Sequence, residues 1–550
     1  MTPSAPSSDF AGALLAGFVS SGVQDVVLSP GSRSQALALA AAALEAAGSI
    51  RLRVRIDERV AGFVALGLAV ETRTPVLIIT TSGTAVANLH PAVLEAHHSG
   101  VPLIVLSSDR PDELRGIGSN QTTDQPGIFG SAVTTVLDVA APSGEAGELA
   151  SAAAIARDAV LAAQAGPVQV NLAFREPLSS AVIEPVEITP TPPEVVSTGS
   201  TTEIPLRKNT VVVAGHGAGE QAEQVARLLG APLFAEVSSG SHFGPNLSVA
   251  WRELMTEPGF GDAIERVVVF GHPTLSREVP ALIQRAGIET IVVRTPGVED
   301  FNPGHAASQF VDGVAVDGTL DDSRETRAWV GRWVAASRVM LETHDAPDIA
   351  IATADDPKSQ AAFGRAVLAG LRAPVTRRTL VEAVWRMTWP HDRLVLGASR
   401  LIREADRVVP GKKIRVHANR GLAGIDGTIG TGVGIALALE GAGVTRVLLG
   451  DLAALHDAGS LLFGSGEPRP RLQVIVGNDV GGTLFDSLEV AATASAEAFE
   501  RVLLTPQQVD LEQLAAAYGW AYKKVTNRGE LDEALTPTEG TTLIEVPLPR

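Results

Sequence analysis

Short runs of β-branched and other apolar residues recur along the chain, and several of them end in a polar or glycine-rich turn. Clear examples are residues 26–28, 76–79, 447–449 and 474–476, each followed by an alanine- or glycine-rich segment with helical character. Apolar runs of about four to eight residues that alternate with helices are typical of buried parallel strands. The pattern predicts an α/β fold with three doubly wound domains and mainly parallel sheets.

The predicted domains are separated by polar segments. The chain has 550 residues, which is too long for one hydrophobic core. Segments rich in proline, serine and threonine without helical periodicity indicate linkers. We expect a first domain over residues 1–180, a linker over 181–208, a central α/β domain over 209–345, a linker over 346–372 and a third domain over 373–550.

Composition excludes several classes of protein. The formal net charge of −18 argues against a nucleic-acid partner, because such a protein needs a basic surface. No apolar run approaches the roughly 18 residues that span a bilayer, and the start of the sequence lacks the pattern of a secretion signal. The chain has no cysteine, which excludes disulfides. We therefore expect a cytoplasmic protein without membrane insertion, in which local arginines would bind any anionic substrate.

Two neighbouring strands of the third domain end in oxygen-bearing residues. Asp451 and Asn478 each follow a β-branched run, so both should face the crevice at the carboxyl edge of a parallel sheet. A carboxylate, a side-chain carbonyl and a backbone carbonyl in the turn after Asn478 suit magnesium that holds a diphosphate, and manganese accepts the same ligands. Two ordinary strand-to-helix loops would look the same, so both interpretations stay open here.

The first domain has three polar segments of interest. Ser32 and Arg33 precede a predicted helix whose N-terminus suits an anion, although a plain helix cap explains them equally. Glu58 lies at the start of a small-residue helix, where a sheltered carboxyl can share a proton with a bound base, although such acids more often cap helices. The loop over 117–125 is polar enough to carry a site. In the central domain, the glycines of 215–219 match a dinucleotide fingerprint only loosely, which favours a structural turn.

Together these motifs resemble the decarboxylase branch of the thiamine diphosphate enzymes. The separation of Asp451 and Asn478 is close to that of the cofactor-binding motif, with Leu452 and Gly477 in place of its usual glycine and asparagine. Within this branch the chain is similar to the menaquinone-pathway synthases. The resemblance is dense in the first and third domains and weak in the central one. The matching segments are 29–34, 57–59, 81–91, 109–111, 120–121, 419–421, 424–427 and 450–457.

The resemblance implies a thiamine diphosphate-binding fold, with a pyrimidine-binding first domain and a diphosphate- and metal-binding third domain. It implies an enzyme that decarboxylates 2-oxoglutarate and adds the resulting succinyl carbanion equivalent to isochorismate, with release of CO2. The implied cofactors are thiamine diphosphate and Mg²⁺ or Mn²⁺. The implied assembly is a homodimer or a dimer of dimers, with each active site between the first domain of one subunit and the third domain of another.

The resemblance also implies roles for individual residues. Glu58 would hydrogen-bond N1′ of the cofactor, and Ile425 would pack between the two cofactor rings. The expected metal ligands are Asp451, Asn478 and the backbone carbonyl of Val480, with the side chain of Asp479 as the alternative third ligand. The remaining cofactor contacts are Thr81, Ser399, Gly450 and Leu452. The expected catalytic residues are Glu58, Arg33, Gln121, Arg403 and Arg420. The expected substrate-binding residues are Ser32, Arg33, Arg110, Asn120, Gln121, Arg277, Arg403 and Arg420, with Leu484, Phe485 and Leu488 as an apolar wall.

The arginines fit substrates that are dianions, because a guanidinium binds a carboxylate through two parallel hydrogen bonds. A surface ion pair is the alternative for each arginine alone. Two other classes stay open. Another 2-oxo acid decarboxylase or an acetohydroxyacid synthase would explain Glu58 and the metal motif but not this arginine set. A non-catalytic regulatory relative would not need Glu58, Asp451 and Asn478.

Overall fold

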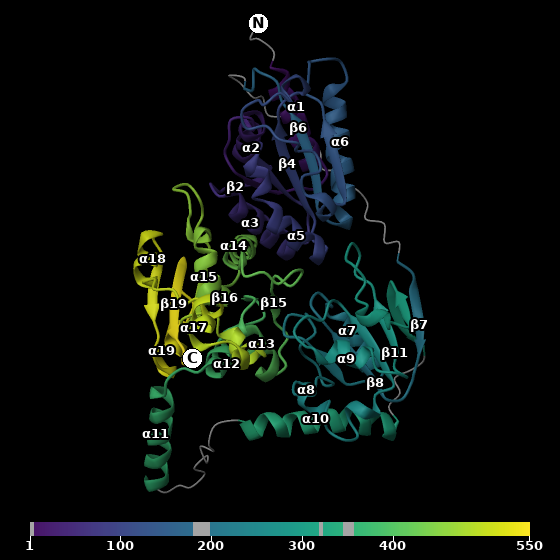
Figure 1. Cartoon of the computed structure of the whole chain (residues 1–550), viewed down its shortest axis with the longest axis vertical. Helices are drawn as coiled ribbons and strands as arrows, with labels where there is room; N and C mark the ends of the chain where they lie inside the picture. The colour runs from purple at the N-terminus through teal and green to yellow at the C-terminus, as the bar shows by residue number, and fades with distance from the viewer. Residues whose placement is uncertain (1–4, 180–198, 318–322, 345–356) are drawn as a thin grey trace.

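The computed structural model of the chain describes residues 5–179, 199–317, 323–344 and 357–550 (Figure 1). The chain forms three α/β units, which we call the first, central and third units. Every pairing between named strands is parallel, which confirms the predicted fold class. None of the described helices is long and apolar enough to cross a membrane.

The first unit has a six-stranded sheet with the order β2-β1-β3-β4-β6-β5. Its strands are β1 (Asp25–Leu28), β2 (Arg51–Val54), β3 (Val76–Thr80), β4 (Leu103–Asp109), β5 (Thr135–Val139) and β6 (Val168–Ala173). Its helices are α1 (Pro6–Ser20), α2 (Gln35–Ala46), α3 (Glu58–Thr72), α4 (Thr84–Ala87), α5 (His90–Ser99) and α6 (Glu148–Ala162), with short 3₁₀ turns η1 (Asp112–Leu114), η2 (Gly130–Ala132) and η3 (Ala163–Ala165). The connections run in opposite directions from β1, so a crevice opens beyond the ends of β1 and β3.

The third unit repeats this topology, with the order β15-β14-β16-β17-β19-β18. Its strands are β14 (Arg393–Leu396), β15 (Arg415–His417), β16 (Thr445–Gly450), β17 (Leu472–Asn478), β18 (Ala521–Lys524) and β19 (Thr541–Pro547). Its helices are α11 (Pro357–Arg372), α12 (Arg377–Met387), α13 (Arg400–Val408), α14 (Thr428–Ala438), α15 (Asp451–His456), α16 (Val490–Thr493), α17 (Ala496–Phe499), α18 (Leu511–Ala517) and α19 (Arg528–Ala534), with short turns η6 (Ala458–Leu461), η7 (Thr483–Ser487) and η8 (Glu500–Leu504). The corresponding crevice lies beyond β14 and β16.

The central unit has a five-stranded sheet with the order β12-β11-β10-β8-β9, and a two-stranded sheet of β13 and β7. Its strands are β7 (Thr201–Pro205), β8 (Thr210–Ala214), β9 (Leu233–Ala235), β10 (Arg266–Phe270), β11 (Glu289–Val293), β12 (Gln309–Val311) and β13 (Gly313–Asp317). Its helices are α7 (Gln221–Leu228), α8 (Trp251–Leu254), α9 (Glu278–Ile283) and α10 (Arg324–His344), with 3₁₀ turns η4 (Gly261–Ala263) and η5 (Pro303–His305). Figure 1 shows this unit beside the third unit and below the first.

Two predicted linkers differ from the structure in part. Residues 201–205, expected within the linker 181–208, form strand β7, which pairs with β13. The two-stranded sheet tolerates the terminal Pro205, because an edge position needs fewer backbone donors. Residues 357–372 of the expected linker 346–372 form helix α11. The rest of both linkers, except residues 199–200 and 206–208, lies outside the described residues, and the division into domains stays a prediction.

Helices α3 and α14 join the first and third units through closely packed glycines. A Cβ atom on Gly67 would lie 2.0 Å from the backbone oxygen of Thr431, and one on Gly434 would lie 2.1 Å from that of Val64. Side chains at these positions would separate the helices, so both must be small. One hydrophobic core includes buried residues of both helices. This packing fixes the start of α3, and with it Glu58, relative to the third unit.

Candidate active site

The crevice of the third unit brings Asp451 and Asn478 to the same edge of the sheet, as the sequence predicts. Strands β16 and β17 pair in register with Gly450 beside Gly477, so Asp451 directly after β16 and Asn478 at the end of β17 lie at adjacent strand ends. Asp451 is 5% exposed, and its Oδ2 accepts a hydrogen bond from the N–H of Gly481 at 2.8 Å. The chain after β17 therefore folds back over the first carboxylate.

The two aspartates of this crevice have different surroundings. The carboxylate of Asp479 forms an ion pair with Arg377 at 2.7 Å and accepts a hydrogen bond from Thr483 at 2.6 Å. No cation in the described part of the chain pairs with Asp451, and burial raises the pKa of its carboxyl group. A buried carboxylate without a counter-charge is costly, so the Asp451 side chain is the one suited to a bound cation.

The turn after β17 has an unusual backbone. Val480 has a φ of 57°, and its side chain is 56% exposed. Asn478 Nδ2 donates to Glu545 at 2.8 Å, and Asn478 Oδ1 accepts the N–H of Val480 at 3.2 Å. The described residues contain no cluster of three His, Cys, Asp or Glu side chains that could hold a metal. A metal here would need the mixed set of one carboxylate, one amide and one backbone carbonyl.

Further predicted cofactor residues surround the same strand ends. Ser399 caps α13, accepting the N–H of Leu401 at 3.2 Å, and its Cβ would lie 3.7 Å from a Cβ on Gly450. Leu452 is half-buried in the first turn of α15. Ile425 is 40% exposed on the loop before α14. The residues expected to form the apolar wall of the substrate site, Leu484 and Phe485 in η7 and Leu488 just after it, are also half-buried.

Glu58 is the first residue of α3, but it is not the residue that caps this helix. The preceding Asp57 takes that role, because its Oδ1 accepts the N–H of Arg59 at 2.9 Å and of Val60 at 3.2 Å. The Glu58 side chain is half-buried, so the expected shelter from water is only partial within one chain. Its carboxylate is therefore available for another partner.

Two arginines meet in the crevice of the first unit. Arg110 is 7% exposed and donates a hydrogen bond to Ser82, whose hydroxyl also donates to the backbone oxygen of Gln121 at 2.8 Å. Burial lowers the pKa of Arg110, and the neighbouring charge of Arg33 adds to this effect. Arg33 donates to the backbone oxygen of Phe174 at 3.1 Å. Two adjacent guanidinium groups favour an anion between them.

The rest of the first unit's predicted site lies in the same loops. Ser32, Asn120 and Gln121 are exposed, and Gln121 has a φ of 55° while its Nε2 donates to the backbone oxygen of Ser82 at 2.9 Å. Thr81 is 7% exposed, and its buried Oγ1 has no hydrogen-bond partner among the described residues. Sequence reasoning missed Ser82 as a connecting residue, although it lies inside the matching segment 81–91.

A second group of arginines lies between the central and third units. Arg420 is 4% exposed and donates from Nε to Thr274 Oγ1 at 2.9 Å. Burial lowers the pKa of Arg403, and the charge of Arg277 lowers it further, so these two side chains are also neighbours. Arg277 itself is exposed and lies 4.0 Å from Glu489. No hydrogen bond or ion pair between described residues joins this group to the arginines of the first unit.

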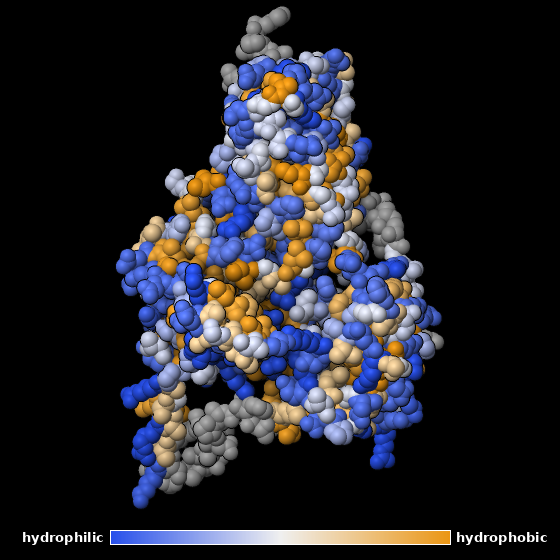
Figure 2. Space-filling model, in the orientation of Figure 1, coloured by the Kyte–Doolittle hydropathy of each residue, from blue (hydrophilic) through white to orange (hydrophobic). Residues whose placement is uncertain are grey.

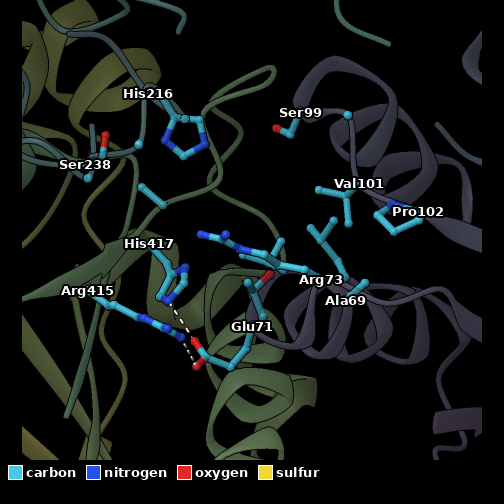
Figure 3. A pocket seen from close by; sticks show the side chains of 18 of the residues that line it. Ala69, Glu71, Arg73, Ser99, Val101, Pro102, His216, Ser238, Arg415 and His417 are labelled. Carbon is cyan, nitrogen blue, oxygen red and sulfur yellow. Dashed lines mark hydrogen bonds and ion pairs between the residues drawn. The ribbon is translucent and has the colours of Figure 1, made fainter. Parts of the chain in front are cut away.

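A cleft of about 1340 Å³ lies between the units, but none of the predicted site residues lines it. In Figure 3, Glu71 at the end of α3 faces Arg415 and His417 of β15. Its carboxylate accepts hydrogen bonds from Arg393 at 2.7 Å, Arg415 at 2.9 Å and His417 at 3.1 Å. Burial raises the pKa of Glu71, but the hydrogen bonds from His417 and Arg393 outweigh it and hold the pKa at about 2. We interpret this cluster as a structural link between two units.

Comparison with known proteins places these features in a family. Residues 9–128 match the family described as thiamine pyrophosphate enzyme, N-terminal TPP binding domain. The chain is 57% identical over 576 positions to the 2-succinyl-5-enolpyruvyl-6-hydroxy-3-cyclohexene-1-carboxylate synthase of Leifsonia xyli subsp. xyli (strain CTCB07), covering 99% of this chain and 97% of the relative. The synthase of the same name from Arthrobacter sp. (strain FB24) is 42% identical, covering 96% of this chain and 86% of the relative.

A solved structure shows the same fold at low identity. Benzoylformate decarboxylase from Polynucleobacter necessarius superposes with a TM-score of 0.66 and 17% identity, covering 99% of both chains. At this identity the likeness shows the fold alone. The assignment to a particular family rests on the two synthases described above, which match nearly the whole chain. The chain therefore belongs to the 2-succinyl-5-enolpyruvyl-6-hydroxy-3-cyclohexene-1-carboxylate synthase family of thiamine diphosphate enzymes, which confirms the resemblance seen in its sequence.

Proposed function

We propose that the chain decarboxylates 2-oxoglutarate and adds the succinyl carbanion equivalent to isochorismate, giving 2-succinyl-5-enolpyruvyl-6-hydroxy-3-cyclohexene-1-carboxylate and CO2 in menaquinone biosynthesis. The observation that carries this proposal is the 57% identity over 99% of the chain to a synthase of that name. Glu58, expected to be catalytic, and Asp451 and Asn478, expected to bind the metal, are all present. The presence of these three residues argues against a non-catalytic regulatory relative.

The cofactor residues of this chain have surroundings that fit the proposed group. Thiamine diphosphate, when bound, supplies a nucleophilic carbon and accepts the electron pair left by decarboxylation. Glu58, which is not used as a helix cap, would hydrogen-bond N1′. Among the described residues, the buried Thr81 hydroxyl has no hydrogen-bond partner and the buried Asp451 carboxylate has no counter-charge. Asp451, Asn478 and the Val480 carbonyl would hold Mg²⁺ or Mn²⁺ against the diphosphate.

We propose that the third metal ligand is the Val480 carbonyl and not the Asp479 side chain. Asp479 already has a largely buried ion pair with the half-buried Arg377 and a hydrogen bond from Thr483. Turning this carboxylate to a metal would leave Arg377 without its partner. Val480, by contrast, has a left-handed backbone and lies in the exposed turn after β17. Its carbonyl group is therefore outside the strand.

The two arginine groups support substrates with two carboxylates. Arg33 and Arg110 of the first unit, with Ser32, Asn120 and Gln121 nearby, would bind one anionic group. Arg403 and Arg420 of the third unit, with Arg277 of the central unit, would bind another. A 2-oxo acid with a single carboxylate would leave one buried guanidinium group without an anion, and that is unfavourable. This arrangement favours dianionic substrates over those of acetohydroxyacid synthases.

We further propose a homodimer, or a dimer of such dimers, in which the two arginine groups come from different subunits. Several large apolar side chains around the predicted site are exposed, including Ile56 at 71%, Val502 at 65% and Val480 at 56%. Figure 2 shows hydrophobic side chains gathered over the part of the third unit that contains α15 and α17. Exposed apolar surface of this kind favours a protein partner. The absence of cysteine fits our proposal of a cytoplasmic location.

A product assay tests the proposed reaction. The protein incubated with thiamine diphosphate, Mg²⁺, 2-oxoglutarate and isochorismate is expected to release CO2 and form the named product, identified by mass spectrometry. Leaving out isochorismate should abolish the product. Formation of a simple aldehyde or acetolactate, at a rate that does not depend on isochorismate, would instead assign the chain to another 2-oxo acid decarboxylase or an acetohydroxyacid synthase.

Mixing two inactive variants tests the shared site. Glu58→Gln removes a group of the first unit, and Asp451→Asn removes one of the third. If each site combines these units from different subunits, every hybrid dimer has one intact site and one with both defects. Random exchange of equal amounts should then restore about a quarter of the wild-type activity, because half of the dimers are hybrids. If each site lies within one chain, no mixture should regain activity.

A further inference from the structure

A buried glutamate of the first unit holds the loop of the third unit that carries Arg420. Glu95, on α5, is 5% exposed. Its two carboxylate oxygens accept the backbone N–H groups of Gly421 at 2.7 Å and Leu422 at 2.8 Å. The hydroxyl of Ser99 donates to the same carboxylate at 3.2 Å. Charge-assisted bonds to two consecutive peptide groups fix the backbone directly after Arg420.

Close packing on both sides leaves this loop little freedom. A Cβ atom on Gly421 would lie 2.8 Å from Ser99 Oγ and 2.9 Å from the backbone oxygen of Glu95, so the loop lies directly against α5. On the other side, Arg420 donates from Nε to Thr274 Oγ1 at 2.9 Å and from Nη2 to the Thr274 backbone oxygen at 3.2 Å. Arg420 is therefore held on two sides, because its guanidinium group binds the central unit and the backbone that follows it binds the first unit.

We propose that Glu95 is a positioning residue, which orients the Arg420 guanidinium toward a carboxylate of a dianionic substrate. This inference rests on the substrate-binding role proposed for Arg420 above. A guanidinium group binds a carboxylate well only when its planar fork is aligned. Misalignment weakens substrate binding equally in the ground state and the transition state, so the effect should be seen in KM and much less in kcat.

Glu95→Gln tests the inference with little change in side-chain volume. The amide keeps one acceptor oxygen, but its nitrogen cannot accept the second N–H. The KM for the substrate bound by Arg420 should rise about tenfold, with kcat changed by less than about threefold. The matched control is Glu148→Gln, whose carboxylate also accepts two consecutive N–H groups, from Ser143 at 2.9 Å and Gly144 at 2.8 Å, in a loop of the first unit. The control should leave KM unchanged.

A double-mutant cycle separates this inference from the proposed role of Arg420. Arg420→Ala identifies the relevant substrate as the one whose KM it raises. In that background, Glu95→Gln should raise the same KM by less than about twofold, because its effect is transmitted through Arg420. A full additive increase overturns the inference. So does an unchanged KM in Glu95→Gln alone, whereas an unchanged KM in Arg420→Ala overturns the role of Arg420 as well.

A second variant covers the case in which Glu95→Gln does not fold. Ser99→Ala removes only the hydroxyl donor and keeps both backbone hydrogen bonds of Glu95. It should raise the same KM about two- to threefold, since one neutral contact to the carboxylate is lost. A wild-type KM in a folded Ser99→Ala protein, together with a Glu95→Gln protein that does not fold, would assign Glu95 to stability alone and overturn the inference.

Discussion

Replacing Glu58 with glutamine is expected to lower kcat for 2-oxoglutarate decarboxylation about a thousandfold, the range of a lost general acid–base group. Glutamine keeps the shape and one hydrogen-bonding oxygen, so the affinity for thiamine diphosphate should change by less than about threefold. Glu58 has no capping role in α3, because Asp57 fills it, so the free energy of unfolding should stay near its wild-type value. Initial rates of CO2 release and calorimetric titration of the cofactor measure the two effects.

The chain offers a control in a similar helix. Glu512 also lies in the first turn of a helix, α18, whose N-cap Asp510 accepts two backbone N–H groups. Glu512→Gln therefore removes the same charge near a helix N-terminus, at a residue that is not among the predicted site residues. It should leave kcat unchanged. A wild-type decarboxylation rate in Glu58→Gln would show that the role proposed for Glu58 is wrong.

Asp451→Asn is expected to affect metal binding and Asp479→Asn to affect stability, although the two residues share one crevice. Asp451→Asn should weaken Mg²⁺ binding about a hundredfold, because a charged ligand is replaced by a neutral one. Asp479→Asn should change Mg²⁺ affinity by less than about threefold, but lower the free energy of unfolding by about 1–3 kcal/mol, because the half-buried Arg377 loses its carboxylate partner. Mg²⁺ titration of activity and denaturant unfolding measure the two quantities.

These two variants also test the third metal ligand. If Asp479→Asn abolished metal-dependent activity while its stability stayed at the wild-type value, the Asp479 side chain and not the Val480 carbonyl would be the ligand. Thr483→Val is a suitable control, since it removes the hydroxyl that donates to Asp479 and leaves the ion pair with Arg377. It should cost stability of about 1 kcal/mol and leave metal affinity unchanged.

Much of the fold could be predicted because its signals are local. Buried parallel strands need apolar runs such as 76–79 and 447–449, and polar or glycine-rich turns follow where strands meet helices. The helix expected after residue 34 is found at Gln35–Ala46. Strand β7 was missed because its local signal is misleading. Its residues, Thr201–Pro205, have the composition of a linker, and the strand pairs with β13, which is distant in the sequence.

The sequence by itself determined the fold class, the polar residues at the strand ends and, through its motifs, the family. It did not reveal that the first and third units share one strand order, because parallel sheets require apolar strands and not a particular sequence. Only the tertiary structure decided that Asp479 pairs with an arginine while Asp451 has no cationic partner among the described residues, that the arginines form two groups, and that Glu95 holds the Arg420 loop. These outcomes depend on contacts between residues far apart in the chain, and local patterns of hydrophobic and polar residues do not encode such contacts.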